Sequence, residues 1–269
     1  MQKPKPRSVR KPRTVPKTKT VPKTNTARKP KTGRKPKTGR KPPARVAKKI
    51  IMAIDVGGSH VKFKLNSSDQ LYREISGSDM DASAMVAKVK ALAANLQFDV
   101  ITIGYPGPVS HYRIVAEPAN LAKGWVGFDF SKAFGKPVRI VNDALMQAIG
   151  SYDGGRMLFL GLGTGLGSAM IVDHFALPLE LAHLPFRKGK TYEERVGDLA
   201  RKKRGSKKWR KDVGKMIEQV RLAMEPDYGV IGGGNAAKIT DLPQDFRYGD
   251  NDNAFIGGFR VWDLPELKV

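Results

Sequence analysis

The stretch from Ile50 to Leu65, IIMAIDVGGSHVKFKL, constrains the fold of this chain more than any other segment. An apolar run reaches Asp55, a Gly57-Gly58-Ser59 turn follows, and apolar residues then alternate with Lys62 and Lys64. A period of two predicts a half-buried strand after the turn, and therefore a β-hairpin. Adjacent glycines let backbone N–H groups face an anion, and a neighbouring carboxylate can hold the accompanying Mg²⁺. The hairpin is either a phosphate site or a plain Gly-Gly turn.

Predicted strands and helices alternate after this hairpin, which indicates an α/β protein. Residues 81–97 carry apolar side chains three and four positions apart, the spacing of an amphipathic helix. The run DVITIG at 99–104 is typical of a strand buried on both faces, and a YPGPV loop follows it. A second glycine-rich hairpin, GLGTGLG, is predicted at 161–167. Further strands are predicted at 71–75, 138–141, 157–162, 168–172 and 227–231, and further helices at 142–152, 207–225 and 253–262.

The charge of the chain is concentrated at its N-terminus. The 269 residues have a formal net charge of +24, and residues 1–49 hold 20 Lys and Arg without any Asp or Glu. Repeated Lys-Pro and Lys-Thr units predict a disordered, extended tail, because apolar content is low and like charges repel. Such a tail can bind DNA, RNA or polyphosphate through counterion release, or it can be a solubilising extension. It has no aromatic residue for base stacking, so sequence-specific recognition of nucleic acid is not expected.

Composition also excludes several classes of protein. The chain has no Cys, which rules out disulfides and thiolate metal sites and agrees with a reducing cytoplasm. No apolar run is long enough to span a membrane, and the N-terminus lacks the apolar region of a secretory signal. We therefore expect a cytoplasmic protein, associated with the nucleoid or with polyphosphate if the tail binds either.

Eight motifs place the chain near a known family. DVGGSHVK, PGPV, NLAKGW, VNDA, GLGTGLGSA, ELAHLPF, YEERV and GGG occur in the order found in ROK-family sugar kinases. The chain resembles the polyphosphate/ATP glucokinase branch most, over nearly all of 50–262 and none of the tail. The resemblance implies the two-lobed, ribonuclease H-like α/β fold of the actin/hexokinase ATPases, with sugar and phosphoryl donor meeting in a cleft. We expect a disordered basic tail at 1–49, an N-terminal lobe at 50–141 and a C-terminal lobe at 142–269. The last helix, at about 253–262, either stays with the second lobe or packs back on the first, and a homodimer is the oligomeric state that the family suggests.

Asp143 is the predicted general base. It follows a buried strand and opens a helix, so its carboxylate should face the cleft and accept the proton of the attacking hydroxyl. The alternative is that Asp143 only caps the helix, where Asp and Asn are favoured.

The resemblance also implies the ligands of the two substrates. Sugar hydroxyls would be bound by Asn120, Asn142, Glu180, His183 and Glu193, with the neighbouring Glu194 as an alternative to Glu193. Donor phosphates would be bound by Gly57, Gly58, Ser59 and Lys62 in the first hairpin and by Gly163, Thr164 and Gly165 in the second. Gly232, Gly233 and Gly234, at the predicted start of a helix, would bind an adenosine or more phosphate. Asp55 would position Mg²⁺ through water.

Four further features bear on the resemblance. No Cys-rich zinc motif follows His183, and no helix-turn-helix precedes Ile50, which disfavours a sugar-responsive repressor. The usual ELGH motif reads ELAH, so a methyl at Ala182 either tightens the sugar pocket or shifts the backbone. A basic cluster, RKGK at 187–190 and RKKRGSKKWRK at 201–211, is either a solvated helix face or a cationic track for a linear polyanion.

We therefore predict a hexokinase that transfers a phosphoryl group from polyphosphate, ATP or both to the 6-hydroxyl of glucose, with Mg²⁺ as cofactor. One alternative is a catalytically weak ROK-like protein that binds sugar or polyanions and is tethered to nucleic acid by its tail. Another is a nucleoid- or polyphosphate-granule-associated protein in which the tail dominates. The sequence leaves the preferred hexose, the donor and the partner of the tail open.

Overall fold

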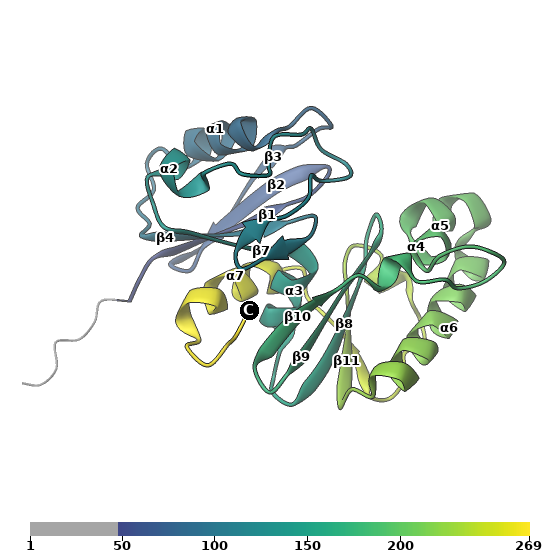
Figure 1. The fold of residues 1–269 in the computed structure, drawn as a ribbon. Coiled ribbons are helices and arrows are strands. Elements are labelled where there is room, and N and C mark those ends of the chain that lie inside the picture. Colours follow the sequence, from purple (N-terminus) through teal and green to yellow (C-terminus); the bar gives the residue numbers. More distant parts are fainter. Residues whose placement is uncertain (1–47) are drawn as a thin grey trace, which may run out of the picture. The chain divides into compact units, whose positions relative to one another are not determined.

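The computed structural model describes residues 48–269, which form two β-sheets with helices on their outer faces and two helices between them (Figure 1). The predictions of disorder and polyanion binding concern the tail, of which residues 1–47 lie outside the described part of the chain. Within residues 48–269, no helix combines the length and the hydropathy that crossing a bilayer requires.

The first sheet has five strands in the order β3-β2-β1-β4-β7. The first three are antiparallel neighbours, and β4 and β7 add to β1 in parallel. The strands are β1 (Ile51–Val56), β2 (His60–Leu65), β3 (Ser68–Ile75), β4 (Val100–Tyr105) and β7 (Val138–Asn142). Helices α1 (Ala82–Leu92) and α2 (Phe130–Phe134) cover one face, and a small hairpin of β5 (Val109–Ser110) and β6 (Arg113–Ile114) follows β4. Met85, Val86 and Val89 of α1 are buried against this sheet, as the three- and four-residue spacing predicts.

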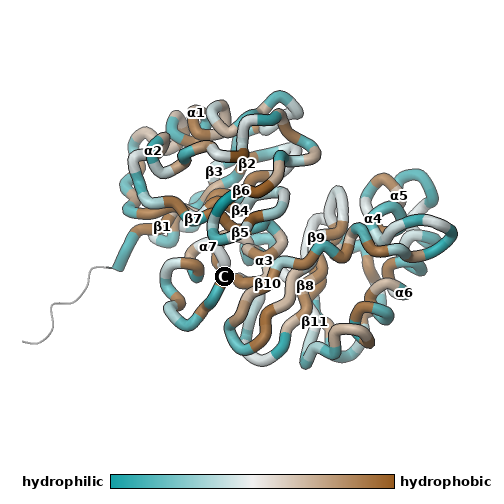
Figure 2. Tube along the Cα trace, in the orientation of Figure 1, coloured by the Kyte–Doolittle hydropathy of each residue, from teal (hydrophilic) through white to brown (hydrophobic). Residues whose placement is uncertain are grey.

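The second sheet repeats the same plan in the order β10-β9-β8-β11-β12. Its strands are β8 (Arg156–Leu162), β9 (Leu166–Val172), β10 (Phe175–Leu179), β11 (Tyr228–Gly232) and β12 (Phe246–Tyr248). The outer face is covered by α4 (Glu193–Val196), α5 (Asp198–Arg204) and α6 (Ser206–Met224). Along α6 the chain alternates between hydrophobic and hydrophilic residues (Figure 2), and Trp209 is fully buried with its Nε1 donating to the Val196 carbonyl at 2.6 Å.

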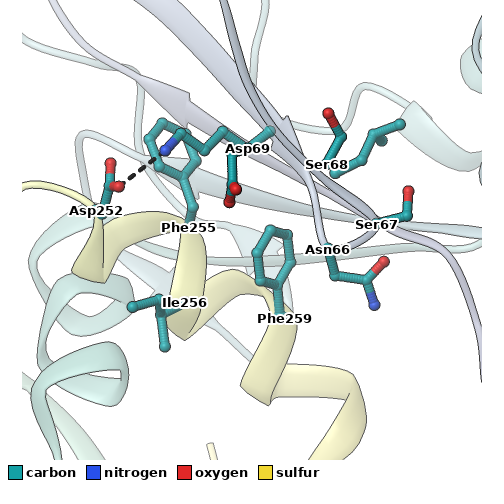
Figure 3. Close-up of a pocket in the computed structure, with 10 residues that line it drawn as sticks. Asn66, Ser67, Ser68, Asp69, Asp252, Phe255, Ile256 and Phe259 are labelled. Atoms are coloured by element: carbon teal, nitrogen blue, oxygen red, sulfur yellow. Dashed lines mark hydrogen bonds and ion pairs between the residues drawn. The ribbon is translucent and has the colours of Figure 1, made fainter.

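Helices α3 (Asp143–Ser151) and α7 (Asn253–Asp263) lie in the layer between the sheets. They cross closely, because a Cβ at Gly150 would lie 1.9 Å from the Asn253 carbonyl oxygen. Helix α7 also contacts the first sheet, since the Thr102 hydroxyl donates to the Gly258 carbonyl at 2.6 Å. Figure 3 shows a further link, the ion pair of Asp252 with Lys64 at 2.8 Å, at a pocket between α7 and the β2–β3 turn. One interhelix layer therefore connects both sheets and carries Asp143 at its edge.

The structure differs from the predicted elements in three places. The first helix ends at Leu92 rather than near residue 97, and the backbone N–H of Ala93 closes its last turn on Val89. The sequence did not predict β10, β12, α2, α4 and α5, which are short. The prediction of a helix start at Gly232–Gly234 is wrong, because a single 3-10 turn, η2 (Ala236–Lys238), follows these glycines. A turn of three residues has no helix dipole of useful size to offer a phosphate.

Candidate active site

Both glycine hairpins open onto one cavity of about 720 Å³. Of the predicted site residues, those that line it are Gly57, Gly58, Ser59, Asn120, Asn142, Asp143, Gly163, Thr164, Gly165, Glu180, His183, Glu193 and Gly233. Four do not line it, namely Asp55, Lys62, Gly232 and Gly234. Asp55 and Lys62 are opposite each other on β1 and β2, just behind the first hairpin turn. Gly232 packs under the cavity, since a Cβ there would lie 2.6 Å from the Phe159 ring.

Asp143 presents one carboxylate oxygen that no protein group occupies in residues 48–269. Its Oδ1 accepts from the Ala144 N–H at 2.8 Å, whereas Oδ2 has no hydrogen-bond partner there. The helix cap is Asn142, whose Oδ1 accepts from the Leu145 N–H at 3.0 Å and whose Nδ2 donates to the Gly107 carbonyl at 3.2 Å. Since Asn142 supplies the cap, Asp143 is not needed for it.

The environment of Asp143 raises its pKa to about 7, first through burial of the carboxyl group and then through the negative charge of Asp55. The charge of Glu180 adds to this rise, while the hydrogen bond from Ala144 opposes it. Burial also raises the pKa of Asp55, and the positive charge of Lys62 counteracts part of that shift. A carboxyl group with a pKa near neutral pH can take up a proton and lose it again under physiological conditions, as a general base must.

The carboxylates of Asp55 and Asp143 are close enough for one charge to shift the pKa of the other. Within residues 48–269, no cluster of three or more His, Asp or Glu side chains could hold a metal ion by itself. One or two carboxylates suit Mg²⁺ when phosphates and water supply the remaining ligands. The carboxylates of Asp55 and Asp143 therefore fit a Mg²⁺ that arrives with a phosphorylated substrate.

The second glycine hairpin packs against Glu193. The Oε2 atom of Glu193 accepts from the Leu166 N–H at 3.3 Å, and a Cβ at Gly165 would lie 2.0 Å from this oxygen. Glu194 instead accepts from Lys190 Nζ at 2.7 Å and from the Thr191 N–H at 2.9 Å, and it does not line the cavity. Of the two glutamates that the sequence left open, Glu193 is the one at the cavity.

The opposite part of the cavity is open and polar. Glu180 precedes the 3-10 turn η1 (Leu181–His183) and His183 ends it, with 3.7 Å between His183 Nε2 and Glu180 Oε2. Their side chains are 56% and 76% exposed respectively, so both are available to a ligand. Ala182 also lines the cavity, and because its φ is not positive, the methyl group narrows the space without straining the backbone.

The sequence analysis missed several residues of this cavity, above all Glu117. Its carboxylate accepts from the N–H groups of Gly124 at 3.1 Å, Trp125 at 3.1 Å and Val126 at 3.3 Å. These bonds, with that from Trp125 the strongest, lower the pKa of Glu117. Glu117 thus closes the loop that contains Asn120. Its partners are backbone groups, which no sequence motif reveals. Gln147, Ser168 and the Pro106-Gly107-Pro108 loop also line the cavity.

The basic cluster divides into neutralised and free cations. Arg187 and Arg204 both bind the buried carboxylate of Asp212, at 3.1 and 2.7 Å. Arg201 and Lys202 bind Asp198, at 2.8 and 2.9 Å. Exposed lysines with no acidic partner in the described part of the chain are Lys188, Lys203, Lys207, Lys208 and Lys211. None of the basic residues of the cluster lines the cavity itself.

Comparisons with known proteins agree with this architecture. Residues 51–177 match the ROK family. The chain is 28% identical over 218 residues to polyphosphate glucokinase of Mycobacterium tuberculosis, covering 73% of this chain and 82% of that protein.

Solved structures with the same fold include the inorganic polyphosphate/ATP-glucomannokinase of Arthrobacter sp. strain KM, with a TM-score of 0.70 and 23% identity over 81% of this chain and 99% of that one. A ROK family glucokinase from Streptomyces griseus, solved with glucose and AMPPNP, has a TM-score of 0.65 and 13% identity over 79% and 98% of the two chains. The predicted fold is therefore confirmed.

Proposed function

We propose that this chain, which carries a ROK family domain and is a sugar kinase, transfers a phosphoryl group from polyphosphate, ATP or both to the 6-hydroxyl of glucose. The observation that carries the proposal is the free Oδ2 atom of Asp143, in a carboxyl group with a pKa of about 7 on the wall of a cavity that both glycine hairpins line. A base and two sets of backbone donors on one cavity are what transfer of a phosphoryl group to an alcohol requires.

The reaction divides among the residues as follows. Asp143 accepts the proton of the sugar 6-hydroxyl while a bond forms between this oxygen and the terminal phosphorus of the donor, and the bond from that phosphorus to its leaving oxygen breaks. Other sugar hydroxyls are bound by Glu180, His183 and Asn120. Glu193 holds the second glycine hairpin in place by accepting from the Leu166 N–H. The amide oxygen of Asn142 accepts from the Leu145 N–H, and its amide nitrogen donates to the Gly107 carbonyl. Asn142 can therefore donate at most one further N–H, to the sugar. Mg²⁺, near Asp55, would neutralise charge on the donor phosphates.

The free lysines of the basic cluster support polyphosphate as one donor. A linear polyanion extends beyond the cavity, and cations outside it would bind the chain through release of counterions. Arg187, Arg201 and Arg204 already pair with Asp212 and Asp198, so the exposed lysines, together with Arg210, are the residues that would make this contact. Since none of these lysines lines the cavity, a compact donor such as ATP should depend on them less.

The test is phosphorylation of glucose by the full chain, with Mg-ATP and long-chain polyphosphate assayed separately. We expect turnover with at least one donor, and absence of turnover with both across several hexoses would contradict the proposal. Replacing Lys203, Lys207, Lys208 and Lys211 by Gln should raise the KM for polyphosphate roughly tenfold and leave the KM for ATP unchanged. The matched control replaces Lys90, Lys132 and Lys136, exposed lysines on or next to helices α1 and α2. An equal increase of the KM for polyphosphate in this control would contradict a specific role of the cluster.

The basic tail supports a second, additional activity, the binding of polyanions. Residues 1–49 contain 20 basic residues and no acidic ones, a composition that neutralises nucleic acid or polyphosphate without reading sequence. Deleting this segment should reduce the salt dependence of DNA and polyphosphate binding while glucose phosphorylation with ATP persists. If turnover falls only with polyphosphate, the tail delivers the donor instead.

A further inference from the structure

The second glycine hairpin is tied to the protein through its carbonyl groups. The Gly163 carbonyl accepts from Asn235 Nδ2 at 3.2 Å, and the Thr164 carbonyl accepts from the Asp198 N–H at 3.1 Å. Both partners come from outside the hairpin, one following β11 and the other starting α5. Two consecutive peptide units are therefore held in a fixed orientation.

That orientation decides where the N–H groups point. In a trans peptide the N–H and the C=O point in opposite directions, so a carbonyl bound to the protein turns the next N–H away from it. The N–H groups concerned are those of Thr164 and Gly165, and both residues line the cavity. Neither N–H donates a hydrogen bond within residues 48–269, whereas the neighbouring N–H groups of Gly163 and Leu166 do. Two free, adjacent N–H groups form a concave site suited to an anion.

Asn235 is built into this arrangement more firmly than a surface side chain. It is 5% exposed, and its Nδ2 also donates to Asp198 Oδ1 at 3.2 Å. Its Oδ1 accepts from Lys238 Nζ, and its backbone N–H donates to the Leu162 carbonyl at 2.9 Å. Both the oxygen and the nitrogen of the Asn235 amide therefore bind protein groups. Asp198 is held in turn by ion pairs with Arg201 and Lys202.

We propose that Asn235 and Asp198 are positioning residues that set the affinity of the second glycine hairpin for donor phosphate. The proposal rests on the proposed function in one respect, namely that this hairpin binds the donor. The side chain of Asn235 must be a donor toward both of its neighbours, the Gly163 carbonyl and the Asp198 carboxylate. Asn235→Asp would place an acceptor against these two acceptors and release the Gly163 carbonyl. The peptide could then rotate, and a phosphate would meet a carbonyl oxygen in place of an N–H.

The experiment measures binding of tripolyphosphate and of AMPPNP, each with Mg²⁺, to the full chain by calorimetry. For Asn235→Asp we expect at least about tenfold weaker binding of both probes, as two hydrogen bonds of a buried group are lost. The dissociation constant for glucose should stay within about twofold, because the sugar side of the cavity does not contact Asn235. In turnover, the KM for the donor should rise more than the KM for glucose, a split that a general loss of structure would not produce.

The matched control is Asn66→Asp. Asn66 likewise uses both its amide oxygen and its amide nitrogen, accepting from the Ile51 N–H and donating to the Lys49 carbonyl, each at 3.0 Å, but at the start of the first sheet. It should leave both phosphate probes and glucose unaffected. If Asn235→Asp does not fold, Asn235→Ser removes the same two donors without adding a charge. Asp198→Asn keeps the backbone N–H to Thr164 and should weaken phosphate binding less than the loss of Asn235.

The outcomes separate the two proposals. A wild-type chain that phosphorylates glucose, together with an Asn235 variant that binds both probes as tightly as wild type, would overturn the positioning role alone. A wild-type chain that binds neither probe and shows no turnover would overturn the proposed function and this inference with it. Equal loss of phosphate and glucose binding in the Asn235 variants would also contradict positioning, because it would indicate a general structural effect.

Discussion

The two halves of the described chain share a backbone plan and differ in chemistry. Each sheet has three antiparallel strands followed by two parallel ones, and the fifth strand leads into a helix of the central layer. Strand β7 leads into α3, which begins at Asp143, and β12 leads toward α7, which begins beside Asp252. Asp143 lies on the cavity wall with a raised pKa, whereas Asp252 is exposed and paired with Lys64. The start of one central helix thus holds a candidate base, and the start of the other holds a surface ion pair.

The two glycine hairpins differ in the same way. The first follows the carboxylate of Asp55, and a Cβ at Gly58 would make only an ordinary contact of 3.6 Å with Asn120. The second has its carbonyls bound by Asn235 and Asp198 and is packed tightly on Glu193. Both halves contribute carboxylates and glycine turns to the cavity, but only the second hairpin has its carbonyl groups bound by side-chain and backbone donors from outside it.

The largest expected effect tests the difference between the two helix starts. Asp143→Asn should lower turnover by about 10²–10⁴-fold, because the amide has no basic oxygen to accept the hydroxyl proton. Asp252→Asn, at the equivalent start of α7, should stay within about twofold, since an exposed ion pair contributes little. Glucose binding by calorimetry should be similar in both variants. Comparable turnover of the two variants would contradict the assignment of Asp143 as base.

Much of the fold could be predicted from the sequence, because local sequence signals and the final fold agree. The strands at 99–104 and 157–162 are nearly continuous apolar runs, and the hairpins carry glycines at the turns, so both local signals agree with the final fold. The strand β12 has three residues, too few to show any period, and it exists only because β11 is beside it.

The residues that position the site could not be predicted from local sequence signals. Asn142 and Asp143 stand out because a polar pair follows an apolar strand. Asn235 and Glu117 bind backbone groups of distant segments, and the sequence does not show which carbonyl or N–H will be near. Such residues are found only once the chain is folded.

The next effect separates the two hairpins. Gly165→Ala should lower kcat/KM for the donor by roughly 10–100-fold, because its methyl group would displace Glu193 and with it the hairpin. Gly58→Ala should cost less, since its methyl group has room beside Asn120. Gly214→Ala, on the exposed face of α6 with no atom near, is the control and should stabilise the protein by about 0.5–1 kcal/mol. If Gly58→Ala is the more damaging change, the first hairpin is the more constrained one.

The contribution of the contacts between α7 and α3 to stability can be tested by mutation. Arg260 Nη1 donates to the carbonyls of Ile149 at 2.8 Å, Gly150 at 3.1 Å and Tyr152 at 2.9 Å, at the end of α3 opposite Asp143. Arg260→Ala should lower the free energy of unfolding by about 2–3 kcal/mol, since these partly buried carbonyls lose a charged donor. Arg221→Ala, which breaks surface ion pairs with Glu218 and Asp245, should lower the free energy of unfolding much less, because ion pairs exposed to solvent contribute little. Urea unfolding at one pH measures both, and equal values would show that α7 is held by packing alone.

The last prediction concerns the pH dependence of turnover and of stability that Asp143 should confer. Since the pKa of Asp143 is raised to about 7, kcat/KM should fall roughly tenfold per pH unit below that value, as the base becomes protonated. The same shift sets a sign for stability. The folded state binds the proton more tightly than the unfolded state, whose pKa is near 3.8, so this group stabilises the fold below pH 4 and that contribution is lost as the pH rises through 7. Asp143→Asn should therefore be more stable than wild type above pH 7, with the difference disappearing near pH 4. Thermal unfolding at pH 4.5 and 8 measures this, and a stability gain for Asp143→Asn that is the same at both pH values would contradict the raised pKa.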